Sequence, residues 1–356
     1  MVFVSDEKPY SLAGLPESLS YAVGRLAVMP SVPPAAAITA LDVVAEALAL
    51  QGITRDQLWR AMREATMDSL PAPEGTDQAL GSLVNAGDLS GPVRTLYQRP
   101  LETQLYSTGW PQLDRLYKVA PGQWTLVTGV PNHGKSSVVD ALALNLMRRD
   151  DWKIAVYSAE NLPVERHLAR FMEKWCGKRF WPGASDRLGP LHVAGGIDWF
   201  ADHLTFLKPA QDPPTLDTIL RLGEWAAKVG CRGLVIDPWN ELLHERPAWM
   251  SETEYISGAL GQLGRFAKRL QMHVWLVAHP QKLYRGKDGS YPVPTPYDVS
   301  GSAHFRNKAD NCLCVYRQQR DTPSPTEVYV QKIRFAEVGE IGMAELTYHP
   351  QSGGFR

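Results

Sequence analysis

The 356-residue sequence has few cysteines and no long apolar run. Its four cysteines, Cys176, Cys231, Cys312 and Cys314, form no C-x-x-C pair, so their spacing does not support a zinc ribbon or a thioredoxin-type site. Three of them sit in apolar surroundings, which is typical of core thiols and favours a reducing compartment. No stretch approaches the roughly 18 apolar residues of a membrane span, and the N-terminus lacks the basic flank of a secretory signal. We therefore expect a cytoplasmic protein with no membrane partner.

The sequence also lacks an excess of either charge. Its net charge is −1, which excludes a chain made uniformly basic to coat nucleic acid but not one with a local basic groove. The two parts of the chain nevertheless differ, since residues 1–110 carry 7 Lys and Arg against 12 Asp and Glu, whereas residues 111–356 carry an excess of cations. This change of sign predicts two regions with different partners.

The pattern of apolar residues divides the chain into three regions. Residues 1–70 contain two stretches with helical spacing, at 41–50 and 54–67, and predict a small, mainly α-helical region of unknown role. Residues 71–106 contain Gly and Pro and predict a linker. Residues 107–356 alternate strand and helix patterns, which predicts an α/β fold with a mostly parallel twisted sheet flanked by helices. Strands are expected at 124–129, 153–158, 203–207, 232–237, 273–278, 312–316, 327–333 and 343–348, the last three antiparallel or mixed. Helices are expected at 135–147, 162–175, 215–229 and 252–270.

A phosphate-binding loop is the clearest motif. Residues 129–136 read GVPNHGKS and fit G-x-x-x-x-G-K-[ST] without a mismatch. The motif follows an apolar strand and opens a helix, a context that fits a phosphate loop better than a simple glycine turn. Lys135 would reach the β- and γ-phosphates, and the Ser136 hydroxyl would ligate Mg²⁺. The predicted nucleotide-binding residues are Gly129, Val130, Pro131, Asn132, His133, Gly134, Lys135, Ser136 and Ser137, of which Pro131, Asn132 and His133 occupy filler positions.

Three further polar residues follow the ends of predicted strands, at the edge where parallel sheets carry their chemistry. Asp237 is predicted to bind the water shell of Mg²⁺. A solvated acid at a strand end is the less favoured alternative. Glu160 could be the base that orients the attacking water or an ordinary acid at a helix start, and the local pattern leaves both open. His279 could contact the γ-phosphate, although a lone histidine at a strand end is more simply a structural residue.

The segment 280–304 predicts a long functional loop, because it has several Pro and Gly residues and little periodicity. Residues 282–320 carry seven Lys and Arg against three Asp and Glu, with aromatic residues between them. Cations and aromatics together are typical of single-stranded nucleic acid binding, whereas the alternative is a solvated loop. The candidate DNA-binding residues are Lys282, Arg285, Lys287, Gly301, Ser302, Arg306 and Asn307.

Several sequence blocks occur in an order and spacing that resemble a known family. They are 107–116 (STGWPQLDRL), the phosphate loop, 158–161 (SAEN), 236–241 (IDPWNE), 277–280 (VAHP), 297–310 (YDVSGSAHFRNKAD) and 331–335 (QKIRF). With these blocks, residues 107–356 resemble the hexameric replicative helicases of the DnaB superfamily (SF4). The resemblance is closest to the Twinkle-like branch and to the helicase half of phage primase–helicases.

The resemblance implies a RecA-like P-loop NTPase core in a homo-hexamer or heptamer that unwinds DNA during replication. Such a ring would bind single-stranded DNA and hydrolyse ATP, or another NTP or dNTP, with Mg²⁺ between neighbouring subunits. It makes Glu160 the expected catalytic base and His279 the expected γ-phosphate sensor, alongside the catalytic Lys135. The loop after His279 would then be the central DNA-binding loop, with 238–253 and 317–325 as further channel loops. The setting implied is the cytoplasm of a bacterial or phage-infected cell.

Lys332 and Arg334 have a physical argument of their own. Residues two apart on a strand share a face, so both cations point the same way. By resemblance to the family, they reach the neighbouring subunit's γ-phosphate. Two solvated cations on a surface strand are the alternative.

The N-terminal part departs from the phage primase–helicases. Its first 106 residues contain no cysteine and are too few for a zinc ribbon and a primase fold, so no priming activity is expected. The region could be a small helical domain, a shrunken remnant, or a docking module for a primase, polymerase or loader. Residues 92–102 occupy the place of the family's linker helix, which docks on the adjacent subunit, and the proline at each end of this stretch predicts a short helix.

Two other functions remain open from the sequence. One is a RecA-type recombination or circadian-clock ATPase ring that does not unwind DNA. The other is an inactive ring that binds a loader.

Overall fold

The computed structural model describes residues 84–98, 105–183, 186–287, 289–301, 303–318 and 324–356. The predicted helical region at 1–70, most of the linker and Ser302 lie outside these residues. The chain divides into two units, Met1–Gly91 and Pro92–Arg356.

A short helical segment occupies the second half of the predicted linker. A 3₁₀ turn, η2 (Ala86–Leu89), is capped by Asn85, whose side chain accepts a hydrogen bond from the Gly87 amide at 2.8 Å. Helix α4 (Ser90–Gln98) follows directly. This short helix overlaps the stretch 92–102 in which one was expected, and Pro92 sits in its first turn. A proline is tolerated there because the amides of the first turn have no intrahelical acceptor.

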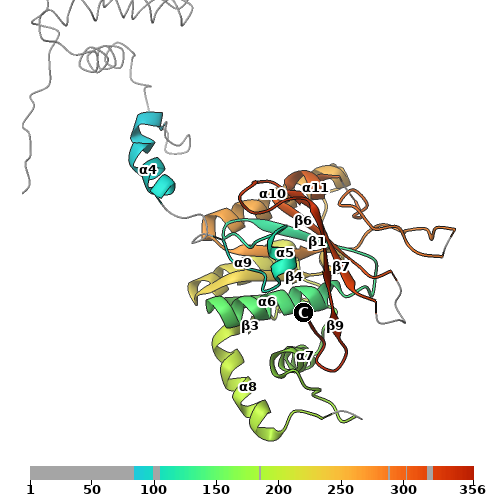
Figure 1. Ribbon diagram of the computed structural model, residues 1–356. Helices are drawn as coiled ribbons and strands as arrows, with labels where there is room; N and C mark the ends of the chain where they lie inside the picture. The colour runs from blue at the N-terminus through green and yellow to red at the C-terminus, as the bar shows by residue number, and fades with distance from the viewer. Residues whose placement is uncertain (1–83, 99–104, 184–185, 288, 302, 319–323) are drawn as a thin grey trace, which may run out of the picture. The chain divides into compact units, whose positions relative to one another are not determined.

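An eight-stranded sheet forms the centre of the second unit (Figure 1), in the order β3-β2-β4-β5-β1-β6-β7-β8. The six strands from β3 to β6 in this order are parallel, and β7 and β8 continue the sheet antiparallel. The strands are β1 (Trp124–Thr128), β2 (Lys153–Ser158), β3 (Leu204–Phe206), β4 (Cys231–Asp237), β5 (His273–Val277), β6 (Asn311–Tyr316), β7 (Thr326–Ile333) and β8 (Gly342–Leu346). This confirms the mostly parallel sheet and its antiparallel end.

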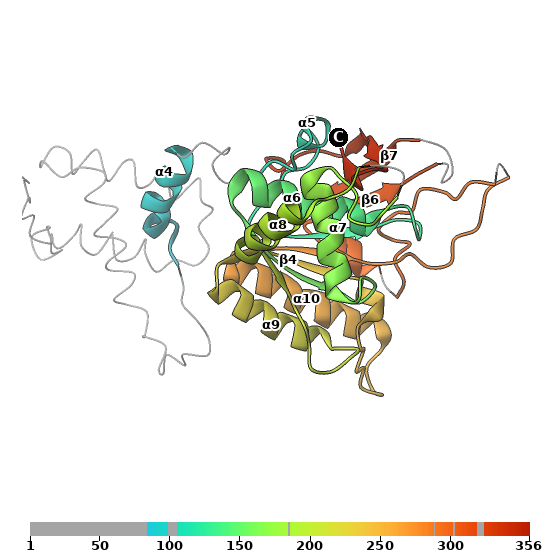
Figure 2. The ribbon, with the colours of Figure 1, turned by 90° about the horizontal axis from the view of Figure 1, so that it is seen from below.

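Helices cover both faces of the sheet (Figure 2). Helices α6 (Lys135–Asp150), α7 (Val164–Cys176) and α8 (Pro190–His203) lie on one face, and α9 (Leu216–Lys228) and α10 (Glu252–Leu270) lie on the other. Strand β5 shows how one sequence serves two cores, because Trp275 packs with the α6 side and Leu276 with the α10 side. Since a central parallel strand is buried on both faces, its sequence is a continuous apolar run.

The close packing around Trp275 depends on a glycine in the neighbouring strand. A β-carbon placed on Gly233 would lie 2.5 Å from Ile154 Cδ1 and 2.8 Å from the Trp275 ring. Any larger residue would therefore force the side chains of β2 and β5 apart.

The sequence analysis missed several short or glycine-containing elements. Helix α8 contains Gly195 and Gly196, which lower helix propensity and hide the pattern. It ends at His203, so the strand expected at 203–207 is only Leu204–Phe206. The other elements missed are α5 (Pro111–Asp114), η4 (Trp239–Glu241), α11 (His304–Lys308) and the hairpin of β9 (Tyr348–His349) and β10 (Gly354–Phe355).

The block at 107–116 ties the start of the core to the phosphate-loop helix. Asp114 Oδ1 accepts hydrogen bonds from the Thr108 amide at 2.6 Å and from its hydroxyl at 2.7 Å. Asn145 of α6 donates to the Thr108 carbonyl at 2.8 Å. This block therefore has a structural role in the fold.

Among the described helices, none combines the length and apolar character needed to cross a membrane.

A buried polar cluster links the amino ends of β1 and β5. Tyr117 Oη lies 2.9 Å from Thr125 Oγ1 and 3.1 Å from His273 Nε2. His273 Nδ1 lies 2.7 Å from the Ala120 carbonyl, so Nδ1 carries the proton and donates it. Burial lowers the pKa of His273 to about 4, so the ring is neutral at pH 7 and Nε2 accepts.

We expect Tyr117→Phe to lower the free energy of unfolding by about 0.5–1.5 kcal/mol, because it removes a buried hydrogen bond, while Thr125 Oγ1 and His273 Nε2 still pair at 2.9 Å. Denaturant unfolding followed by tryptophan fluorescence measures the change. Tyr97→Phe is the matched control, since Tyr97 is 91% exposed on α4 and should change nothing. Equal stability of both variants would show that the cluster contributes nothing.

Candidate nucleotide-binding site

The phosphate loop joins β1 to α6 at the carboxyl edge of the sheet. A β-carbon on Gly129 would overlap the Val315 carbonyl oxygen, so only glycine lets the loop pass β6 this closely. Gly134 caps α6 with a φ of 97° and no side-chain hydrogen bond. The first amides of α6 are therefore left to an anion, as a phosphate site requires.

Lys135 lies against the loop that precedes it. Its Nζ donates to the Gly129 carbonyl at 3.1 Å and to the Val130 carbonyl at 3.3 Å. Burial lowers the pKa of this ammonium, while the carboxylates of Asp237 and Glu160 oppose that shift. The predicted phosphate-binding cation and the two predicted acids therefore share one electrostatic environment.

Asp237 ends β4 in register with Ser158 at the end of β2. Its side chain is buried, and burial raises its pKa to about 6, although a hydrogen bond from Ser136 acts in the opposite direction. Its Oδ1 is buried without a hydrogen-bond partner in the described part of the chain. A divalent cation would favour the ionised carboxylate and occupy that oxygen.

The two predicted Mg²⁺ ligands fit the ion. Mg²⁺ prefers oxygen ligands and retains several waters, so the Ser136 hydroxyl and the Asp237 carboxylate beside a phosphate loop suit it. The described residues contain no group of three or more His, Cys, Asp or Glu side chains that could hold a metal by themselves. A site completed by phosphates and water does not need such a group.

Glu160 and His279 contact each other across the carboxyl edge. Glu160 Oε1 lies 3.1 Å from His279 Nε2, and the Glu160 side chain is 48% exposed. Burial lowers the pKa of His279, and the nearby Lys135 charge lowers it further, so the neutral ring donates through Nε2. The His279 amide donates to Asn240 Oδ1 at 2.8 Å, which joins the segment after β4 to the segment after β5. The structure thus places the two predicted residues as a pair.

Lys332 and Arg334 lie at the carboxyl end of helix α11. Lys332 Nζ donates to the carbonyls of Arg306, at 2.6 Å, and Ala309, at 2.6 Å, as well as to that of Asn307, at 3.2 Å. Arg334 contacts the same helix end and forms an ion pair with Asp310 at 2.8 Å. Lys332 is in β7 and Arg334 follows its last residue, and both side chains meet the end of α11. Within one chain, both cations bind the helix that carries two of the predicted DNA-binding residues.

The loop at 280–304 is anchored at its base and exposed at its tip. Pro280 pairs with Val299, and the Gln281 amide donates to the Asp298 carbonyl at 2.7 Å. Lys282, Arg285 and Lys287 are exposed near the tip. Three of the predicted cations lie over tyrosine rings: Lys282 over Tyr284, Arg285 over Tyr291 and Arg306 over Tyr297.

Gly301 has a structural reason to be glycine. Its φ is 100°, and a β-carbon there would lie 2.5 Å from Ile256 Cδ1 of α10. The close approach of the loop to α10 explains this residue without a DNA contact. Ser302 lies outside the described residues, and so do residues 319–323 of the predicted third channel loop.

Several residues around the site were missed or given no role by sequence reasoning. His133 Nδ1 accepts from the Arg317 amide at 3.0 Å, so the loop position taken as filler fixes the phosphate loop to the end of β6. Ser158, Asn161 and Asn240 form hydrogen bonds next to Asp237, Glu160 and His279. All three lie in the blocks 158–161 and 236–241 that carry the family resemblance, beside the predicted acids.

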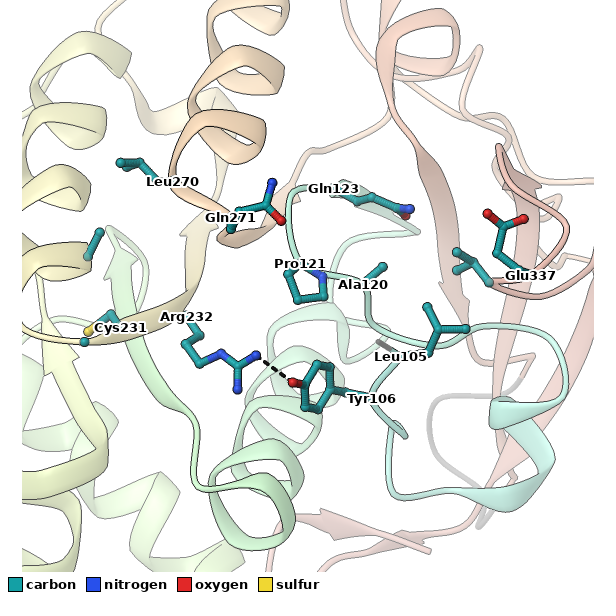
Figure 3. Close-up of a pocket in the computed structure, with 13 residues that line it drawn as sticks. Leu105, Tyr106, Ala120, Pro121, Gln123, Cys231, Arg232, Leu270, Gln271 and Glu337 are labelled. Carbon is teal, nitrogen blue, oxygen red and sulfur yellow. Dashed lines mark hydrogen bonds between the residues drawn. The ribbon is translucent and has the colours of Figure 1, made fainter. Parts of the chain in front are cut away.

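A pocket of about 670 Å³ lies at the opposite edge of the sheet, where the strands begin (Figure 3). Its lining includes Cys231 at the start of β4 and Gln271 just before β5. Arg232 donates to Tyr106 Oη at 2.6 Å within it. It contains none of the predicted site residues, so the chemistry is expected at the carboxyl edge.

Comparison with known proteins finds a relative with similarity along most of this chain. A Twinkle homologue of chloroplasts and mitochondria from Arabidopsis thaliana is 37% identical over 304 residues, which cover 83% of this chain. The chain spans 42% of the length of that relative. A scan against protein-family models found no match.

Two solved structures share the fold. One is an ATPase domain that superimposes with a TM-score of 0.62 at 19% identity and covers 76% of this chain and 99% of that chain. The other is a DnaB-like replicative helicase, solved to show its interactions with primase, which gives a TM-score of 0.61 at 18% identity and covers 88% of this chain and 75% of that chain. The predicted RecA-like fold is confirmed. The relative's organellar location leaves the bacterial or phage setting a prediction.

We expect Glu160→Gln to retain nucleotide binding and to lower hydrolysis at least ~100-fold, because an amide cannot accept the proton of the attacking water. Single-turnover hydrolysis and equilibrium binding of a labelled nucleotide separate the two effects. Glu165→Gln is the matched control, since Glu165 is an exposed acid in the first turn of α7. Hydrolysis by Glu160→Gln at the rate of the unmodified chain would exclude Glu160 as the base.

Proposed function

We propose that this chain is the subunit of a ring-forming replicative DNA helicase that couples NTP hydrolysis to translocation on single-stranded DNA. One observation carries the proposal: the carboxyl edge of a single sheet brings together a complete phosphate loop, the buried Asp237 and the paired Glu160 and His279. The 37% identity to a Twinkle homologue supports the same function.

The residues of the site have distinct chemical roles in this proposal. The loop amides and Lys135 bind the phosphates, while Ser136 and Asp237 would hold Mg²⁺, which neutralises developing charge on the phosphates when bound. Glu160 orients the water and accepts its proton. His279, held by Glu160 and by Asn240, reports the state of the γ-phosphate to the loop that begins at Pro280.

Hydrolysis would be completed by the neighbouring subunit. Lys332 and Arg334 project from the end of β7 together, and Arg334 is exposed. A cation supplied in trans stabilises transition-state charge and accelerates phosphoryl transfer by about 10³–10⁵. Such a contact requires a closed ring of identical subunits, a hexamer or heptamer.

DNA would be bound by the loop at 280–304 and by α11. The exposed cations at the loop tip attract the backbone, and the tyrosines beside them offer faces on which bases stack. Because Lys332 and Arg334 contact the end of α11 directly, a change at the neighbour's nucleotide can reach the DNA-binding segment. A primase, polymerase or loader would bind through residues 1–106, whose structure lies largely outside the described part.

The alternative functions fit less well. A ring that does not hydrolyse nucleotide does not need the buried Asp237 and the exposed Glu160 close to Lys135. A RecA-type recombination or clock ATPase shares the core but does not account for paired cations bound to α11. DNA-stimulated hydrolysis together with strand separation distinguishes the three.

We expect neutralisation of Lys282, Arg285 and Lys287 together to weaken single-stranded DNA binding and abolish strand separation. If each contacts one phosphate, the slope of log affinity against log salt should fall by about 2. DNA-independent hydrolysis should persist. Fluorescence anisotropy across a salt series and a forked-duplex assay measure these effects.

The matched control neutralises Lys208, Lys228 and Lys268, which are exposed outside the loop. The control should bind and separate DNA normally. Unchanged binding by the loop variant at about 150–200 mM salt, close to physiological ionic strength, would remove the loop from the proposal.

We expect a mixture of Lys135→Ala and Arg334→Ala chains to hydrolyse more NTP than the two variants do separately. The first variant is defective at its own phosphate loop and the second at its neighbour's. Mixed rings therefore rebuild some interfaces in which an intact loop faces an intact arginine. Hydrolysis is measured after mass measurement has shown that subunits exchange. If mixed rings are shown to form and their activity equals the sum of the activities of the two separate variants, Arg334 does not act in trans.

A further inference from the structure

A short series of hydrogen bonds, which the proposed chemistry does not use, connects Asn161, the residue after Glu160, to Asp237. Asn161 Nδ2 donates to Ser158 Oγ at 2.8 Å, and Ser158 Oγ lies 3.4 Å from Asp237 Oδ2. Asn161, Ser158 and Asp237 are all buried. Because the Ser158 oxygen accepts from Asn161, its hydroxyl hydrogen is directed at the carboxylate.

The other end of the Asn161 side chain is held by α7. Arg170 donates to Asn161 Oδ1, so both polar atoms of this carboxamide are used. An amide that is bound at its oxygen and its nitrogen has one orientation. Asn161 therefore fixes the direction of the Ser158 hydroxyl. It thereby determines which Asp237 oxygen Ser158 contacts.

Helix α7 is itself anchored on the phosphate-loop helix by a buried charge cluster. His167 Nε2 lies 3.0 Å from Asp140 Oδ1, and Lys174 Nζ lies 3.8 Å from Asp140 Oδ2. Residues 167, 170 and 174 fall on one face of α7, because three- and four-residue spacings follow a helix turn. Asp140 lies on α6, four residues after Ser136. The face of α7 that carries Arg170 is therefore fixed to the phosphate-loop helix.

We propose that Asn161 is a positioning residue for the Mg²⁺–nucleotide site. It holds Ser158 against Asp237 Oδ2, which leaves the unpartnered Oδ1 for the metal side, and it directly follows Glu160 in the chain. One side chain thereby sets the geometry of both acids relative to α6. This inference rests on the proposed function, since it assigns Asn161 to the same nucleotide site.

The test is the linkage between Mg²⁺ and nucleotide binding in Asn161→Ala. The probe is fluorescent ADP, titrated onto the full chain in EDTA and across a Mg²⁺ series. We expect the affinity in EDTA to stay within about twofold and the Mg²⁺ concentration at half-saturation to rise about 10-fold or more, as is usual when a residue that orients a metal ligand is removed. Asn161→Asp should behave similarly, because it keeps an acceptor for Arg170 but loses the donor to Ser158.

Asn145→Ala is the matched control, because the Asn145 amide also makes a hydrogen bond next to the core, to the Thr108 carbonyl at 2.8 Å. It should lower thermal stability and leave the Mg²⁺ dependence unchanged. Ser158→Ala is a smaller truncation that should reproduce the Mg²⁺ effect even where Asn161→Ala does not fold.

Unchanged Mg²⁺ half-saturation in Ser158→Ala, and in Asn161→Ala where it folds, would overturn the inference. Equal loss of affinity with and without Mg²⁺ would also overturn it, because that result indicates a purely structural role. An unmodified chain that binds Mg²⁺-ADP but shows no DNA-stimulated hydrolysis would contradict the proposed function alone. An unmodified chain that binds no nucleotide would contradict both.

Discussion

The buried carboxylate of Asp237 is the charge around which the carboxyl edge of the sheet is arranged. Burial raises its pKa to about 6, and the groups near it, Ser136, Lys135 and Ser158, are all able to stabilise the ionised form. A buried carboxylate without such neighbours would be expelled or protonated. The parallel pairing of β2 with β4 brings this support together, because it sets Ser158 beside Asp237 in the same register.

A second constraint links the two ends of the proposed mechanism. The carbonyls at the end of α11 carry partial negative charge, and Lys332 satisfies three of them. If Lys332 and Arg334 are drawn to a neighbour's γ-phosphate, α11 loses these contacts and Asp310 loses its ion pair. The same cations would then alternate between a phosphate and the helix that precedes β6, which provides a physical connection between hydrolysis and movement of DNA.

The sequence analysis predicted features that depend on local pattern. Continuous apolar runs identified the parallel strands, and the phosphate loop was recognised from its motif and its place between strand and helix. Strand alternation placed Lys332 and Arg334 on one face. It could not show that this face meets α11, because that contact depends on β7 turning back along β6. The contact between Ser158 and Asp237 was missed for the same reason, since β2 and β4 are neighbours in the sheet but not in the chain. Helix α8 was missed because two consecutive glycines interrupt its pattern.

The central claim is that nucleotide binds between subunits and controls the contacts of α11. The most direct measurement is an electron cryomicroscopy structure of the full chain with single-stranded DNA, Mg²⁺ and a non-hydrolysable nucleotide. The proposal predicts a closed ring in which the γ-phosphate lies between Lys135 of one subunit and Arg334 of the next, with Lys332 withdrawn from the α11 carbonyls at occupied interfaces. A nucleotide enclosed by one subunit, with Arg334 still paired to Asp310 throughout the ring, would contradict it.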